Sequence, residues 1–248
     1  MSVDAITRLE QIRAELDAEG RVKVAELAEQ LGVSEMTVRR DLDALADLGV
    51  AQRVRGGALA VGPQPFADRY GQQAKAKDAI ADKLLPLVGD GGAVGLDAST
   101  TLQRLAARLG SARAVTVLTN STESFTVLGL HPGVTALLTG GQLDPRTGSL
   151  VGPLARRAAV DVSLRRLFVS AAGLDPIGGT SEATLEEAEV KRALASGADS
   201  VVVAVDSSKL GTRGAASCLP ITQIDVLVTE LDPRDDALDP YRPHCEVL

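Results

Sequence analysis

The chain of 248 residues has no tryptophan, 2% aromatic residues and only two cysteines, Cys218 and Cys245. Neither cysteine has the spacing of a metal-binding or redox motif, which excludes a disulfide scaffold and favours a reducing cytoplasm. No apolar run approaches the roughly 18 residues of a membrane span. The first residues lack the basic start and apolar run of a signal peptide, so no membrane association is expected.

An excess of positive charge is also absent, since the formal net charge is −7. A strongly basic domain is the usual electrostatic sign of nucleic-acid binding. A DNA-binding hypothesis must therefore rest on where the positive charges lie in this chain. What the chain does have is 45% hydrophobic residues, which is enough for a sizeable core built mostly of alanine, valine and leucine.

Two regions of different character are separated by a segment that contains Gly62, Pro63 and Pro65. We predict a helical domain over residues 1–60, a linker over 61–75 and an α/β domain over 76–248. In the last of these, β-branched runs without polar alternation predict strands buried on both faces, with helices between several of them. This order favours a mainly parallel sheet. The predicted strands are Ala93–Leu96, Val115–Leu118, Val134–Leu138, Leu167–Ser170, Val201–Val205 and Val226–Thr229, and the predicted helices are Lys77–Leu87, Thr101–Leu109, Ser121–Leu130 and Glu186–Ser196.

The first domain has the pattern of a helix-turn-helix. Helices are predicted over Asp4–Ala18, Val24–Leu31 and Glu35–Leu48, with Gly32 in the turn before the third. Ser34 is placed to cap the third helix, because its hydroxyl can accept a hydrogen bond from an unpaired backbone N–H. The apolar side chains of this helix share one face, which leaves the opposite face for the DNA major groove.

That opposite face and the segment after it carry the candidate DNA contacts. Arginine pairs bidentately with guanine or binds a phosphate. The segment Gly49–Ala58 predicts a β-wing with a glycine turn, in which the arginines face outward. The alternative is a helical module whose solvated charged face mediates dimerisation or other protein contacts. The predicted DNA-binding residues are Ser34, Met36, Thr37, Arg39, Arg40, Arg53, Arg55, Gly56 and Gly57.

The stretches Val33–Leu42 (VSEMTVRRDL) and Arg53–Ala58 (RVRGGA) resemble the DeoR-type winged helix-turn-helix. The resemblance continues to about Glu230 and covers most of the chain. It implies a transcription regulator, usually a repressor, that is relieved by a small phosphorylated sugar or related metabolite. It also implies a sensor domain with the fold of ribose-5-phosphate isomerase. We expect double-stranded operator DNA as partner and a homo-oligomer, since paired readers match paired half-sites.

Four loops after predicted strands carry polar side chains or glycine, at residues 97–101, 119–121, 140–141 and 206–209. In a parallel sheet all four would lie at the carboxyl ends of the strands, where ligands bind in open α/β sheets. A helix that starts after such a strand attracts a phosphate. The alternatives are plain helix capping by Ser99 or Thr100 and a solvated surface lysine at Lys209.

The resemblance assigns effector contacts to these loops. Lys77 matches a lysine of the family, although Asp78 follows it where the family usually has a basic residue. An isomerase with Asp97 as base and Lys209 as phosphate anchor is the alternative function, but a shared fold does not transfer chemistry. No catalytic residue, metal or cofactor is expected. The predicted effector-binding residues are Lys77, Asp97, Ser99, Thr100, Thr101, Asn120, Gly141 and Lys209.

One acidic segment is given a structural interpretation. Its glutamates could contact sugar hydroxyls, but they are expected to form a solvated helix face, with Lys191 as the i,i+4 partner of Glu187. These glutamates are Glu182, Glu186, Glu187 and Glu189.

Overall fold

A computed structural model describes all residues except 1–2, 48–50 and 61–65. The chain forms two compact units, one of residues Met1–Asp68 with Pro145–Thr147 and one of Arg69–Asp144 with Gly148–Leu248. Leu48, Gly49 and Val50, which belong to the predicted third helix and wing, lie outside the described residues, as does the 61–65 part of the predicted linker.

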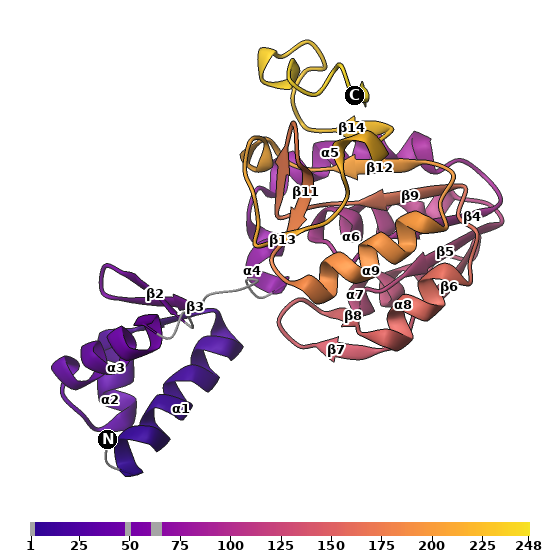
Figure 1. Ribbon diagram of the computed structural model, residues 1–248. Coiled ribbons are helices and arrows are strands. Elements are labelled where there is room, and N and C mark those ends of the chain that lie inside the picture. The colour runs from indigo at the N-terminus through magenta and orange to yellow at the C-terminus, as the bar shows by residue number, and fades with distance from the viewer. Residues whose placement is uncertain (1–2, 48–50, 61–65) are drawn as a thin grey trace. The chain divides into compact units, whose positions relative to one another are not determined.

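The first unit is a winged helix (Figure 1). Its helices pack around a core that includes Ile12, Leu16, Leu27 and Leu42, all fully buried. The three strands form an antiparallel sheet in the order β1-β3-β2. Helix α2 ends at Gly32, whose φ of 64° is a left-handed conformation that glycine adopts without steric cost. The elements are α1 (Val3–Glu19), β1 (Arg21–Lys23), α2 (Val24–Leu31), α3 (Glu35–Asp47), β2 (Ala51–Val54) and β3 (Gly57–Ala60).

The wing differs from its prediction in two respects. The turn consists of Arg55 and Gly56, because Val54 already pairs with Gly57 across the hairpin. Strand β1 was not predicted, since its three residues are too few to show a periodic pattern.

The second unit is built on a seven-stranded sheet in the order β15-β14-β12-β9-β4-β5-β6, in which every pair is parallel. The predicted α/β fold with a mainly parallel sheet is confirmed. The six predicted strands form within one or two residues of their expected ends. The strands are β4 (Ala93–Leu96), β5 (Val115–Thr119), β6 (Val134–Leu138), β9 (Arg166–Val169), β12 (Val201–Ala204), β14 (Val226–Val228) and β15 (Glu246–Val247).

Helices cover both faces of this sheet (Figure 1). Side chains of α8 and α9 pack on one face with Leu167, Val201 and Val203. Side chains of α5, α6 and α7 pack on the other face with Phe168 and Val202. Neighbouring residues of one strand therefore enter opposite cores, which explains the absence of polar alternation in the sequence. The helices are α5 (Ala74–Val88), α6 (Thr100–Ala106), α7 (Thr122–Leu128), α8 (Pro153–Val160) and α9 (Leu185–Ser196).

The remaining elements are short. Helix α4 (Phe66–Gly71), which was not predicted, occupies part of the predicted linker, and Asp68 stands in its first turn. Among the described residues, no helix is both long and apolar enough to cross a membrane. The additional strands are the β7 (Gln142–Asp144) and β8 (Ser149–Val151) hairpin and a small sheet of β10 (Gly173–Asp175), β11 (Gly179–Glu182) and β13 (Ala216–Ser217), and the 3-10 helices are η1 (Leu109–Ser111), η2 (Ser207–Lys209), η3 (Ile221–Gln223) and η4 (Asp236–Leu238).

Candidate DNA-binding surface and effector site

Helix α3 presents one polar face, as its sequence predicts. Ser34 caps the helix, since its Oγ accepts a hydrogen bond from the backbone N–H of Thr37 at 3.2 Å. Val38 and Leu42 are fully buried, whereas Arg39 and Arg40 are exposed. Met36 is 56% exposed. The N-terminal half of α3 therefore offers two cations and one apolar side chain to a groove.

The two arginines of α3 differ in their surroundings. The guanidinium of Arg39 donates to the Glu35 carboxylate at 2.7 Å one turn earlier. Arg40 forms no ion pair with any residue that the structure describes. On the opposite face, the guanidinium of Arg8 pairs with the buried carboxylate of Asp41 at 2.5 and 3.1 Å, which ties α1 to α3. Helix α3 is thus anchored from behind, while Arg40 stays available to a ligand.

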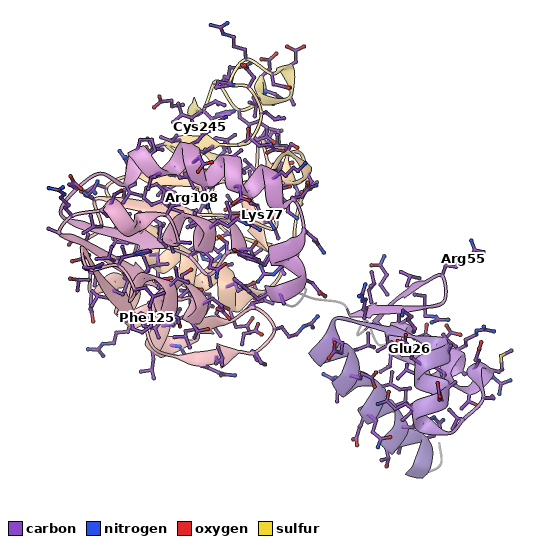
Figure 2. All side chains as sticks on the ribbon, turned by 180° about the vertical axis from the view of Figure 1, so that it is seen from behind. Glu26, Arg55, Lys77, Arg108, Phe125 and Cys245 are labelled. Atoms are coloured by element: carbon purple, nitrogen blue, oxygen red, sulfur yellow. The ribbon has the colours of Figure 1, made fainter. Side chains whose placement is uncertain are left out.

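The two arginines of the wing also differ in their contacts. Arg53, predicted to face a phosphate, instead donates to the Asp43 carboxylate of α3 and to the carbonyl of Gly57, both at 2.8 Å. Its guanidinium finds these acceptors because the wing folds back beside α3. Arg55 is exposed at the tip of the hairpin and extends away from it (Figure 2). Arg53 therefore ties the wing to α3, Arg55 has an exposed side chain, and a phosphate contact from either arginine stays a prediction.

Gly57 has a structural reason to be glycine. A Cβ at this position would lie 2.0 Å from the carbonyl oxygen of Val22, where β1 pairs with β3. Gly57→Ala is expected to destabilise the first unit by about 1–3 kcal/mol, because backbone must move to relieve the clash. Gly56→Ala, which meets no atom within 4 Å and has a φ of 84°, should cost only about 1 kcal/mol of left-handed strain. Chemical denaturation of both variants, followed by circular dichroism, measures the difference, and equal losses would contradict this assignment.

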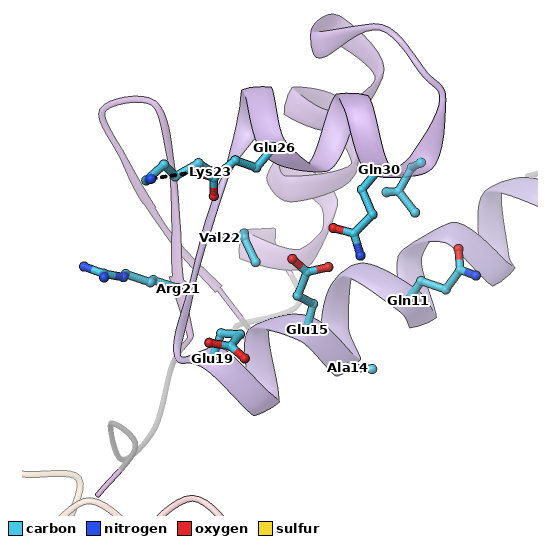
Figure 3. A pocket seen from close by; sticks show the side chains of 10 residues that line it. Gln11, Ala14, Glu15, Glu19, Arg21, Val22, Lys23, Glu26 and Gln30 are labelled. Carbon is cyan, nitrogen blue, oxygen red and sulfur yellow. Dashed lines mark hydrogen bonds and ion pairs between the residues drawn. The ribbon is translucent and has the colours of Figure 1, made fainter. Parts of the chain in front are cut away.

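A groove of about 840 Å³ also lies in the first unit, between α1, β1 and α2. Figure 3 shows Glu15, Glu19 and Glu26 around it, with Arg21 and Lys23 at its side. Lys23 is already paired with Glu26 at 2.6 Å. The carboxylates disfavour a phosphate, so this groove belongs to neither the DNA surface nor the effector site.

In the second unit, the predicted polar loops gather at one edge of the sheet. Strands β12, β9, β4 and β5 are neighbours and parallel, so the residues that follow them lie side by side. Leu96 is in register with Thr119, which places Asp97 next to Asn120. Lys209 follows β12 in η2. Gly141 follows β6, the outermost strand of the sheet. Its φ is 122°, and a Cβ added there would lie 2.6 Å from the Val151 carbonyl oxygen, so the position requires glycine.

The hydroxyl loop is built around the start of α6. Ser99 Oγ accepts a hydrogen bond from the backbone N–H of Leu102 at 3.2 Å, so it is the helix cap. Thr100 and Thr101 are 4% and 2% exposed. The Asn120 amide donates to the Leu150 carbonyl at 3.2 Å, while its Oδ1 has no hydrogen-bond partner among the described residues. Capping of α6 is therefore seen, and an effector contact from this loop stays a prediction.

Lys77 lies close to this edge and is 6% exposed. Its ammonium donates to the Arg69 carbonyl at 2.5 Å. Burial lowers the pKa of Lys77 to about 8, Asp206 opposes that change, and Lys209 adds to it. Lys77 therefore lies within electrostatic range of Asp206 and Lys209, and a shared anion for the two lysines stays a prediction.

The acidic residue after Lys77 has a role of its own. The carboxylate of Asp78 receives hydrogen bonds from Arg104 at 2.9 Å and from Arg108 at 2.8 Å. The bond from Arg108 is the main reason that the pKa of Asp78 lies below its ordinary value. Asp78 thus joins α5 to the end of α6, which accounts for an acid where the family usually has a basic residue.

The interpretation of the acidic segment is wrong in part. Glu182 lies on β11 rather than on a helix and is 4% exposed, and Glu187 is 8% exposed. Lys191 pairs with Glu182 at 2.7 Å and with Asp97 at 2.8 Å, not with Glu187. The i,i+4 spacing predicted the wrong partner because Lys191 lies on the apolar side of α9 with Ala188 and Leu194.

The sequence did not predict that Lys191 and Ser170 lie against Asp97, or that Lys191 joins Asp97 to Glu182. A signal for Lys191 was available, since a lysine three residues from both Ala188 and Leu194 falls on a buried helical stripe. No local pattern marks Glu182 or Ser170, whose positions depend on the packing of α9 against the sheet. Among the described residues, no group of His, Cys, Asp or Glu is arranged to hold a metal ion.

Comparisons with known proteins cover both units. Residues 8–64 match the DeoR-like helix-turn-helix domain, and residues 72–231 match the DeoR C terminal sensor domain. The HTH-type transcriptional regulator GolR of Listeria innocua is 32% identical over 87% of this chain and 86% of its own. The glycerol-3-phosphate regulon repressor of Escherichia coli is 28% identical over 87% of this chain and 86% of its own. Ribose 5 phosphate isomerase A from Neisseria gonorrhoeae is similar in structure with a TM-score of 0.40, at 19% identity over 56% of this chain and 54% of its own.

A winged helix with free cations on α3 and the wing, followed by an α/β unit with a polar cluster at its sheet edge, defines a DNA-binding transcription regulator with a sensor domain. The chain belongs to the DeoR family, since family models match both parts. Its curated relatives are regulators rather than enzymes, so the isomerase alternative finds no support among them.

Proposed function

We propose that this protein represses genes of carbohydrate metabolism and leaves its operator when a small phosphorylated sugar or related metabolite binds. The observation that carries the proposal is the cluster at the carboxyl ends of β4, β5 and β12, in which buried polar side chains stand near Lys77 and Lys209. The family model for the second unit describes a sensor domain. A relative of similar length is named for the glycerol-3-phosphate regulon.

Each part of the effector has a proposed set of contacts. The two lysines neutralise the phosphate, and the backbone N–H groups and hydroxyls at the start of α6 add donors. The acceptor oxygens of Asp97 and Asn120 receive hydroxyl hydrogens. Gly141 borders the site from the loop after β6. The proposed contacts are Lys77, Asp97, Ser99, Thr100, Thr101, Asn120, Gly141 and Lys209.

Release from DNA follows from a shift between two arrangements of an oligomer. We propose a homo-oligomer whose paired winged helices match two operator half-sites, with Ser34, Met36, Thr37, Arg39, Arg40, Arg55 and the wing glycines at the DNA. An effector that binds more tightly to the arrangement whose winged helices do not match the half-site spacing lowers the affinity for the operator. The ratio of its affinities for the two arrangements limits the size of this decrease. Such a regulator acts where its operator lies, which we propose is the cytoplasm.

The proposal is tested with the purified full-length chain and DNA from upstream of its own gene. Fluorescence anisotropy at low salt should show saturable binding that competitor DNA of unrelated sequence does not remove. Addition of the correct sugar phosphate should release the DNA and raise the melting temperature, because a ligand stabilises the state that binds it. Absence of specific operator binding would overturn the regulatory role. Operator binding that no phosphorylated metabolite alters would overturn the effector class alone.

A further inference from the structure

Helix α4 is too short to be stable through its own hydrogen bonds. It has six residues, none of them buried, and isolated helices of fewer than about 12 residues are marginal in water. The carbonyl groups in the last turn of a helix have no donor within it. Two of these carbonyls receive bonds from cations of neighbouring helices: Lys77 of α5 donates to Arg69 at 2.5 Å, and Arg104 of α6 donates to Tyr70 at 2.8 Å. The end of α4 is therefore held by α5 and α6.

The side chain of Arg104 joins α6 to both of the other helices. Besides the Tyr70 carbonyl, its guanidinium donates to the carboxylate of Asp78 in α5 at 2.9 Å. Its Cζ also lies 4.3 Å from the centre of the Tyr70 ring, within the range of a cation–π interaction. A guanidinium can hold these partners together, because it is planar and its N–H groups point in fixed directions. Arg104 therefore fixes the last turn of α4 against α5 and α6.

Packing alone does not account for an arginine at this position. Arg104 is 8% exposed, and its Nε has no hydrogen-bond partner among the described residues. Burial of a charged group with an unsatisfied donor is costly. A methionine would fill the space between the helices without this cost. What the arginine adds is a set of directional bonds between α6 and the end of α4.

The place of Arg104 in α6 relates it to the proposed effector site. Thr100 and Thr101, two of the proposed contacts, begin α6, and Arg104 follows one turn later on the same side of the helix. Lys77, the other cation at the end of α4, is itself a proposed contact. An effector that displaces the start of α6 or attracts Lys77 therefore acts on the bonds that hold α4.

We propose that Arg104 is a positioning residue that couples the effector site to α4, so that effector binding is transmitted to the first unit through this helix. The chain passes from the first unit to the second between Asp68 and Arg69, inside α4. A displacement of the end of α4 therefore alters the connection to the winged helix. This inference rests on the proposed function and names the route of its regulation.

The first test measures how far a phosphate ester weakens operator binding. Anisotropy titrations of the full-length protein give the operator Kd with and without saturating glycerol 3-phosphate, ribose 5-phosphate or fructose 6-phosphate. For at least one ester the ratio of the two Kd values should be of the order of 5–150 in the wild-type protein, the usual size of an allosteric coupling, and about one in Arg104→Met. Because the ester is saturating, a change in its own affinity does not enter the ratio.

Arg166→Met is the matched control. Like Arg104, Arg166 donates to a carbonyl in the last turn of a helix, that of Leu87 in α5 at 2.7 Å, and its buried Nε has no partner among the described residues. It stands at the start of β9, at the edge of the sheet opposite the effector loops, so its ratio should equal that of the wild-type protein. Arg104→Met should fold, because Asp78 keeps its bond from Arg108 at 2.8 Å.

Tyr70 allows α4 to be followed directly, in a measurement that needs no variant. The other tyrosine of the chain, Tyr241, is 2% exposed, whereas Tyr70 is 37% exposed, so acrylamide should quench mainly the fluorescence of Tyr70. The ester that releases the operator should change this quenching in the wild-type protein, because α4 moves. The same ester should leave the quenching unchanged in Arg104→Met.

The outcomes separate this inference from the proposed function. A wild-type ratio in Arg104→Met would show that the arginine is only structural, which would overturn the inference while the effector-controlled repressor stands. Operator release without a change in Tyr70 quenching would also overturn it, since the effect on DNA binding would then bypass α4. If none of the three esters releases the operator, the proposed effector class fails, and the inference fails with it because α4 has no effect to transmit.

Discussion

Replacing Lys191 with methionine is expected to lower the free energy of unfolding of the second unit by about 3–5 kcal/mol. Methionine retains an unbranched side chain in the core, so little packing is lost. It leaves the carboxylates of Glu182 and Asp97, 4% and 0% exposed, without their cation. Burial removes the water that would otherwise stabilise these charges, which is why the expected loss is several times that of a surface ion pair.

The composition of the chain allows the unfolding of the second unit to be measured by itself. Its only tyrosines are Tyr70 and Tyr241, and it has no tryptophan; both tyrosines belong to the second unit. Tyrosine fluorescence during urea unfolding therefore reports this unit alone. Lys75→Met, at an exposed position of α5, is the control and should change stability by less than about 0.5 kcal/mol. A loss below about 1 kcal/mol in Lys191→Met would contradict the need for this cation.

The pH dependence of this stability has a definite sign. The pKa of Glu182 is raised by burial from 4.5 to about 7 in the folded protein. Between these values the folded state binds more protons than the unfolded state, so the contribution of Glu182 is fully present below 4.5 and is lost as pH rises through 7. Urea unfolding should show the stability of Glu182→Gln gaining on that of the wild-type protein from about pH 5 to about pH 8. A constant difference would contradict the raised pKa.

Arg40→Ala is expected to reduce operator affinity by about 1–3 kcal/mol and to relax sequence preference at one base pair. Arg40 is exposed on the recognition face of α3 and forms no ion pair with the residues that the structure describes. Its side chain can therefore enter a groove without giving up an existing partner. Anisotropy titrations with operator variants, each with one base pair changed, measure both effects.

The other arginines serve as matched controls. Arg39 already pairs with Glu35 at 2.7 Å, so Arg39→Ala should cost less than Arg40→Ala. Arg55→Ala should weaken binding to all sequences alike and reduce the slope of log K against log[salt] by about one, the signature of a lost phosphate contact. A uniform loss in Arg40→Ala with an equally reduced salt slope would instead identify Arg40 as a phosphate contact.

The periodicity of apolar residues predicted most of the helices and sheet strands, because such elements form between residues that are near neighbours in the chain. The runs at Ala93–Leu96 and Val134–Leu138 gave strands with those bounds, and the face of α3 with Met36 and Arg40 was correct. Strands β1 and β15 were missed because each is a short segment held by partners far along the chain. The helix over residues 66–71 was not predicted because it is too short to show a clear apolar period.

The chain has no positive net charge, and the sequence alone determined that four of its arginines, Arg39, Arg40, Arg53 and Arg55, lie in α3 and the wing. Tertiary structure decided what each charge does. Arg53 bonds to Asp43 and Gly57, so it supports the wing. Lys191 lies against Asp97 and Glu182 beneath the sheet edge, although its sequence neighbour at i−4 is Glu187. The physical reason is the same in both cases: helical and strand patterns follow from bonds between near neighbours, whereas a buried ion finds its partners wherever the packed elements exclude water.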